Sequence, residues 1–138
     1  KKVEELIGKA VLDYANNKLL PLEQDHSKAA WGARRNLADC KLDFSFTNSK
    51  IHNFFRALVK PYPLPFIEFK EKRFFIEEYH IHQQNIEALT LGRVVNIDDK
   101  GIWIKVKEGY LNVRKLSDEN GMEVNMKEIF RIGSRLDA

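Results

Sequence analysis

The sequence predicts an α+β fold, in which an N-terminal helix and a linker precede a short helix packed on a small β-barrel of five to six strands. Two observations indicate this fold. Apolar residues recur every three to four positions before about residue 60 and every second position from Phe66 onward. In that second part, short apolar runs are separated by Gly- and Asp-containing segments, which is typical of hairpins.

The first helix is expected over residues 3–17. Its apolar face must be buried against another element, and little of the following sequence offers cover. Asn16 and Asn17 followed by Pro21 end the helix. We therefore expect the partner of this helix to lie upstream, and residues 19–40, which have no sustained period, to form a linker. The face consists of Val3, Leu6, Ile7, Ala10, Val11 and Tyr14.

The second helix is expected to begin after Thr47, Asn48 or Ser49, each of which can cap it through a side-chain oxygen. Pro61 lacks an amide proton and disfavours helix at the residue before it, so the helix is expected to end at Lys60. One apolar stripe follows from its spacing of three and four: Ile51, Phe54, Phe55 and Leu58.

Strands are expected at residues 66–69, 73–81, 94–97, 102–106 and 110–116, with a last short helix at residues 125–130. Five short strands joined by hairpins favour a barrel of the oligonucleotide/oligosaccharide-binding (OB) type. The sequence thus predicts a barrel domain over residues 41–138.

Composition limits the class of protein. The chain has 138 residues, 43% of them hydrophobic and 31% charged, which is ordinary for one soluble domain. It contains no apolar run long enough for a membrane span and no signal-peptide pattern. The single cysteine, Cys40, cannot form an intrachain disulfide. We expect a cytoplasmic protein whose net charge of +3 permits contact with phosphates without requiring it.

Two groups of residues suggest chemistry, but each has a simpler interpretation. His80 and His82 share one strand face and form a conceivable metal pair, with Cys40 and Asp43 as further ligands. A solvated strand face is favoured, so no metal site is predicted. Cys40 with His26 is a conceivable nucleophile and base, although a small buried cysteine is favoured.

Arg34 and Arg35 are the best binding candidates, because guanidinium groups match phosphate oxygens with paired donors. Ion pairs with Asp39 or Asp43 are the alternative, and the two interpretations stay open. Side chains alternate along an extended linker, so we expect one arginine to face a ligand and the other a carboxylate.

The aromatic residues allow two interpretations. Trp103 is expected in the barrel core or at an interface. Four aromatic residues on the strands could form a stacking platform for bases, while alternation favours a place in the barrel interior for some of them: Phe74, Phe75, Tyr79 and Tyr110.

Several motifs carry a family resemblance. Residues 51–58, followed by Pro61-Tyr62-Pro63, resemble the opening of the C-terminal domain of 10-formyltetrahydrofolate-dependent formyltransferases. Residues 42–45 and 110–113 resemble further segments of that domain. In the linker, a resemblance to the sugar N-formyltransferases rests on Gly32, Arg34, Arg35 and Asp39.

The resemblance implies that residues 1–18 are the terminal helix of an upstream Rossmann-like catalytic domain, which binds 10-formyltetrahydrofolate. The family's catalytic Asn, His and Asp lie in that domain, so no residue of this chain inherits a catalytic role or holds the cofactor. The resemblance implies a chain that orients the acceptor, an amino group of a sugar nucleotide, or that assembles the enzyme.

Three alternatives stay open beside the sugar-nucleotide interpretation. One is the tRNA-binding C-terminal domain of a methionyl-tRNA formyltransferase. Another is a stand-alone OB-type module that binds nucleic acid. The third is a structural domain that forms a homodimer through residues 74–76, where Phe75→Glu would abolish association.

Overall fold

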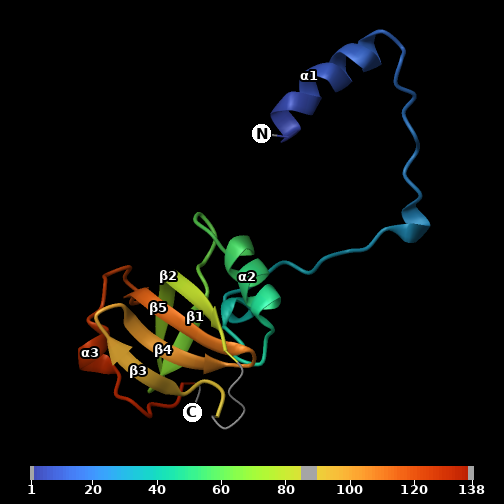
Figure 1. Ribbon diagram of the computed structural model, residues 1–138. Coiled ribbons are helices and arrows are strands. Elements are labelled where there is room, and N and C mark those ends of the chain that lie inside the picture. The colour runs from blue at the N-terminus through green and yellow to red at the C-terminus, as the bar shows by residue number, and fades with distance from the viewer. Residues whose placement is uncertain (1, 85–89, 137–138) are drawn as a thin grey trace. The chain divides into compact units, whose positions relative to one another are not determined.

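The computed structural model describes residues 2–84 and 90–136 (Figure 1). The chain divides into two compact units, residues 1–34 and residues 35–138. Each unit is treated by itself below.

The first unit contains helix α1 (Lys2–Ala15) and a single 3₁₀ turn, η1 (His26–Lys28). The helix confirms the predicted element, and it ends where Asn17 adopts a positive φ of 56°. Its apolar side chains remain open to solvent, with exposed fractions of 59–71% for Val3, Leu6, Ile7, Val11, Leu12 and Tyr14.

The second unit is built on a five-stranded antiparallel sheet, which confirms the predicted strands. The spatial order is β1-β2-β5-β4-β3, and Figure 1 shows the sheet curving strongly. The strands are β1 (Phe66–Phe69), β2 (Lys72–Gln83), β3 (Val94–Asp98), β4 (Gly101–Val106) and β5 (Gly109–Ser117).

Short segments cover both edges of the sheet. On β1, Lys41 forms a parallel bridge to Phe66, and the Leu42 amide donates to the Phe66 carbonyl at 2.9 Å. On β3, Arg93 bridges Arg135, and the Val94 amide donates to the Ser134 carbonyl at 2.8 Å. These contacts satisfy backbone groups that a bare edge would leave available for pairing with another chain.

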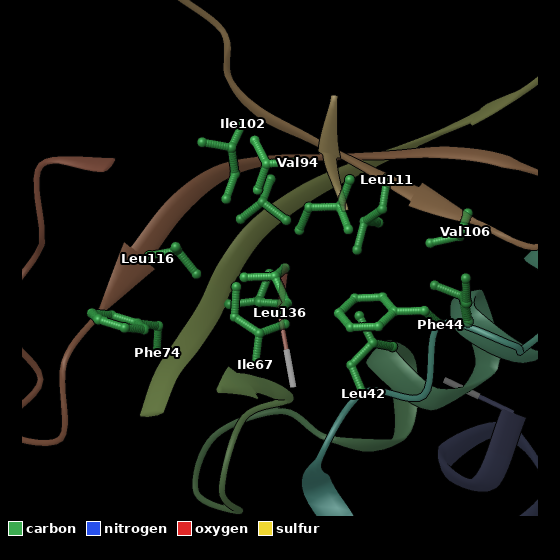
Figure 2. Packing of buried hydrophobic residues seen from close by; sticks show 14 of the residues in the cluster. Leu42, Phe44, Ile67, Phe74, Val94, Ile102, Val106, Leu111, Leu116 and Leu136 are labelled. Carbon is green, nitrogen blue, oxygen red and sulfur yellow. The ribbon is translucent and has the colours of Figure 1, made fainter. Parts of the chain in front are cut away.

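The core fills the concave side of the sheet (Figure 2). Helix α2 (Asn48–Ala57) packs on this sheet through the ring of Phe55, whose centroid lies 3.9 Å from that of Tyr79 on β2. Fully or almost fully buried members include Leu42, Ile51, Ile67, Ile76, Val94, Ile102, Ile104, Leu111, Val113, Leu116, Phe130 and Leu136.

Helix α2 confirms the predicted cap and stripe but is shorter than expected. The Thr47 side chain accepts a hydrogen bond from the Lys50 amide at 3.2 Å. The helix ends at Ala57 instead of Lys60, because Leu58 leaves helical geometry (φ −113°, ψ 72°) and is buried with Cys40 and Phe66.

The C-terminal part of the unit closes over one end of the core. The predicted last helix is α3 (Met126–Ile129), capped by Asn125. Phe130 follows it and is fully buried against Phe69 and Phe74, with ring centroids 5.1 and 5.5 Å away.

Two glycines fix where the strands of the sheet begin. Gly101 opens β4 with φ +117°, and an added Cβ there would lie 2.0 Å from the Val113 carbonyl oxygen. Gly109 opens β5 with φ +143°, and its Cβ would lie 2.0 Å from the His82 carbonyl oxygen. Only glycine fits at such positions, so these residues hold the register of β4 and β5 against their neighbours.

Candidate functional site

The convex side of the sheet, here called the outer face, gathers polar and aromatic side chains. In β4, Ile102 and Ile104 lie in the core, so Trp103 between them lies on the opposite side. The same alternation applies to the neighbouring strands. The outer face is thus formed by His80 and His82 of β2, Trp103 and Lys105 of β4, and Tyr110, Asn112 and Arg114 of β5.

Strand register arranges these residues in two cross-strand rows. Asn112 pairs with His80 on one side and Trp103 on the other. Tyr110 pairs with His82 and Lys105. Three consecutive strands of the sheet therefore contribute to one surface.

Three rings lie side by side on this face and are called the ring row: His80, His82 and Trp103. The centroids of His80 and His82 are 4.6 Å apart, and those of His82 and Trp103 are 4.5 Å apart. Since His82 and Trp103 belong to strands on either side of β5, their contact crosses over that strand. Asn112 on β5 is fully buried.

Hydrogen bonds hold the tryptophan of the ring row in place. Trp103 Nε1 donates to Asp98 Oδ2 at 2.9 Å, and the Lys100 amide donates to Asp98 Oδ1 at 2.8 Å. The Asp98 carboxylate is thus bonded through both oxygens, and the indole is fixed before any ligand arrives.

Asn112 connects the outer face to the β3–β4 turn. Its Nδ2 donates to the carbonyls of Lys100 and Ile102 at 3.3 and 3.4 Å. Its Oδ1 accepts a hydrogen bond from Arg114 Nε at 3.1 Å. This buried amide therefore positions both the turn and an arginine that is exposed at the surface.

The electrostatic surroundings of the ring row are positive. Burial, followed by the charges of His80, Arg114 and Lys100, lowers the pKa of His82. The Arg114 guanidinium lies 3.6 Å from Glu78 Oε1, which is 59% exposed and weakly screens it. Lys105 is 3% exposed, and its Nζ donates to the Gly109 carbonyl at 3.5 Å.

The predicted binding residues Arg34 and Arg35 are both exposed. Within the described residues of its own unit, Arg35 forms no ion pair. The expected carboxylate partners are engaged locally: Asp39 accepts from the Asn36 amide at 2.8 Å, and Asp43 from the Ser45 amide at 2.8 Å. The division of roles between Arg34 and Arg35, and the phosphate-binding role itself, stay predictions.

The structure does not assemble the metal site considered from the sequence among the residues it describes, and it buries the candidate nucleophile. The described residues contain no group of three or more His, Cys, Asp or Glu side chains placed to hold a metal ion. Cys40 is fully buried, and burial raises the pKa of its thiol, which is the opposite of what a nucleophile requires.

The aromatic residues singled out in the sequence divide between the two sides of the sheet. Phe74 and Tyr79 belong to the inner side of the sheet, while Tyr110 lies on the outer face. Trp103 was expected in the barrel core or at an interface. The alternation of Trp103 with Ile102 and Ile104 is the signal that would have placed it opposite the core.

The motif behind the homodimer hypothesis is used inside the domain. Phe74 and Ile76 are 5% and 1% exposed, and Phe75 packs on Phe66 with centroids 5.7 Å apart. The exposed apolar strand that motivated edge-to-edge association is therefore not present at residues 74–76.

A helix both long and apolar enough to cross a membrane is not found in residues 2–84 or 90–136.

The second unit matches a known protein family. The family described as formyl transferase, C-terminal domain, matches residues 36–133, which is nearly all of the second unit. This chain belongs to the formyl transferase C-terminal domain family.

Several similar curated proteins are named methionyl-tRNA formyltransferase. The protein from Caldicellulosiruptor saccharolyticus is 29% identical over 131 residues, covering 93% of this chain and 42% of the relative. That from Clostridium novyi is 24% identical over 127 residues, covering 92% and 40%. That from Mesoplasma florum is 23% identical over 137 residues, covering 94% and 43%. The chain spans about two fifths of the length of these relatives.

Proposed function

We propose that this chain is the C-terminal part of an enzyme that transfers a formyl group from 10-formyltetrahydrofolate to the amino group of methionyl-tRNA. The names of the relatives favour this acceptor over the sugar nucleotide that the linker residues suggested. In this proposal the second unit contacts the tRNA.

The outer face is the observation that carries the proposal. Basic and aromatic side chains alternate with core residues along β4 and β5, so both surfaces belong to one rigid sheet. Proteins that bind RNA combine cations for the phosphates with rings for unpaired bases.

Chemistry is assigned to an upstream catalytic domain. There the amine attacks the formyl carbon, the bond from that carbon to the folate nitrogen breaks, and the amine's proton is transferred to that nitrogen. No residue of this chain is assigned to that step or to the folate. The exposed apolar face of α1 supports a connection to such a domain, because a helix face of this kind is normally buried.

Arg34 and Arg35 are proposed as phosphate contacts near the junction between linker and domain. Both side chains are exposed, and Arg35 is not held by a described carboxylate of its unit. Each guanidinium that contacts a tRNA phosphate releases a counterion, so binding weakens as salt rises.

The first experiment assays the full-length gene product, with 10-formyltetrahydrofolate as donor, on methionyl-tRNA and on an amino-sugar nucleotide. Formylation of methionyl-tRNA is expected. Formylation of the amino sugar alone would overturn the proposal.

The second experiment tests the arginines in the same full-length protein. Each of Arg34→Ala and Arg35→Ala should reduce the slope of log affinity against log salt by about one unit, measured with deacylated tRNA. Lys28→Ala is the matched control, because Lys28 is exposed but already lies 3.1 Å from the carboxylate of Asp25. Unchanged slopes in both arginine variants would remove the phosphate role from the linker.

A further inference from the structure

The ring row lies on the side of the sheet opposite to the aromatic contacts of the main core. Phe55, Phe74 and Phe130 pack inside the core, whereas the ring row lies on the opposite side of the sheet. His80 is exposed, and His82 and Trp103 are half-buried. A row of rings with faces or edges open to solvent offers a surface on which another ring can stack.

The ring row is also fixed in advance. Trp103 is bonded to Asp98, and His82 contacts both neighbouring rings. A ligand that stacks on Trp103 meets an indole that is already held in place, and this lowers the entropic cost of binding.

Charges beside the ring row favour an anionic ligand. Arg114 and Lys100 are exposed, and their charges act on His82 from β5 and from the β3–β4 turn. Of the nearby carboxylates, Asp98 already accepts two hydrogen bonds and Glu78 faces Arg114. The charges that act on the His82 ring are those of His80, Arg114 and Lys100, and the side chains of Arg114 and Lys100 are exposed to solvent.

One buried atom of the ring row lacks a partner. Within residues 2–84 and 90–136, His82 Nε2 has no hydrogen-bond partner although it is shielded from solvent. Buried polar atoms are normally paired, so an unpaired one in a surface cluster calls for an explanation. A small movement of the ring toward a bound polar group would pair it.

We propose that the ring row binds an unpaired base of single-stranded RNA, while Arg114 and Lys100 contact the adjoining phosphates. This inference rests on the proposed function, because tRNA exposes unpaired bases in its loops and at its 3′ end. Double-stranded RNA is not expected to fit, since its bases are stacked inside the helix and only its backbone and groove edges are accessible.

The first test uses fluorescence of the 138-residue chain. The sequence has two tryptophans, so Trp31→Phe leaves Trp103 as the single indole. The probe is a 12-nucleotide oligoadenylate at low salt, compared with its duplex with oligouridylate. Quenching of Trp103 by the single strand and not by the duplex is expected. Equal quenching by both would overturn the inference.

The second test measures affinity for the same oligoadenylate carrying a terminal fluorophore. Trp103→Leu should weaken binding about tenfold or more, the loss of one base-stacking contact. His80→Ala should weaken it in the same direction, and because His80 is exposed, this variant decides the matter where Trp103→Leu does not fold. Tyr62→Leu is the control, as Tyr62 is also an exposed ring (66%) but lies outside the ring row. Wild-type affinity in a folded ring-row variant would overturn the inference.

These outcomes separate the inference from the proposed function. If tRNA binds and is formylated but Trp103 is not quenched and His80→Ala binds normally, the inference fails and the function stands. If oligoadenylate quenches Trp103 but the full-length enzyme formylates only amino-sugar nucleotides, the function fails and the base-binding surface stands.

Discussion

Strands β4 and β5 carry two different surfaces on one backbone. Toward the core, Ile104, Leu111 and Val113 are fully buried. Toward the outer face, Trp103 and Asn112 are held by hydrogen bonds to specific oxygens. The inner side stabilises the fold through area removed from water, which does not depend on direction, whereas the outer side fixes individual atoms in position.

This contrast between the two sides of the sheet predicts whether a substitution changes stability or recognition. Removing an apolar group from the inner side leaves a cavity and lowers the free energy of unfolding. Removing an exposed group from the outer face leaves the core intact and should change recognition instead. Substitutions on the two sides should therefore differ in effect, and the largest change in stability is expected for a core leucine.

Leu111→Ala should lower the free energy of unfolding by about 2–5 kcal/mol, because a fully buried leucine leaves a cavity that its neighbours fill only in part. The measurement is urea denaturation of the 138-residue chain followed by circular dichroism. Arg114→Ala is the matched control on the same strand. Its side chain is exposed and its ion pair is weak, but its Nε also donates to the buried Asn112 Oδ1, so a loss of about 1 kcal/mol, smaller than that of Leu111→Ala, is expected. A larger loss in the control than in Leu111→Ala would contradict the separation of the two sides.

Asn112 is an outer-face residue whose loss should nevertheless lower stability, because it is fully buried. Asn112→Ala removes the donors to the Lys100 and Ile102 carbonyls and the acceptor of Arg114 Nε. We expect a stability loss of about 1–3 kcal/mol. A shift in Trp103 emission should accompany it, because the turn that holds Asp98 loosens.

Asn96→Ala provides the comparison for this residue. Asn96 is an exposed asparagine on β3 that pairs with Trp103 in register, so its loss should change stability by about 0.5 kcal/mol or less. Equal effects of the two substitutions in urea denaturation would mean that the buried amide does not support the outer face.

Local patterns in the sequence were enough to predict the elements of this domain. The strand boundaries agree with the structure to within a few residues, since alternation and Gly-containing turns are encoded locally. Helix α2 ends early for a reason that its own sequence does not show: Leu58 joins Cys40 and Phe66, which lie outside the helix on either side of it. Such a contact exists only after the sheet has formed.

The candidate site was harder to predict for the same reason. His80 and His82 were correctly assigned to one strand face, but Trp103 is about twenty residues away and meets them only because β5 lies between β2 and β4. Asn112 was not predicted as a site residue, because its burial depends on neighbours from two other strands. Arg34 and Arg35 are recognisable in the sequence as adjacent cations, but their phosphate-binding role stays a prediction.

The smallest effect concerns pH and separates the ring row from the rest of the domain. The native pKa of His82 is lowered, chiefly by burial, from an ordinary value of 6.5. Between the native pKa and 6.5 the unfolded chain binds more protons at this residue than the native one. Stability therefore falls as pH decreases through this window and is fully retained above it.

His82→Phe keeps a ring beside Trp103 but cannot titrate. The difference in unfolding free energy between pH 7.5 and pH 5.5, measured by urea denaturation, should therefore be smaller in this variant than in the wild type. Carboxylates with lowered pKa values, such as Asp43 and Glu68, contribute equally to both proteins and cancel. His52→Gln, on the exposed side of α2, is measured in parallel as the control for the loss of a histidine. An unchanged difference in His82→Phe would show that burial of His82 does not restrict its protonation, and the ring row would then be as open to solvent as the rest of the surface.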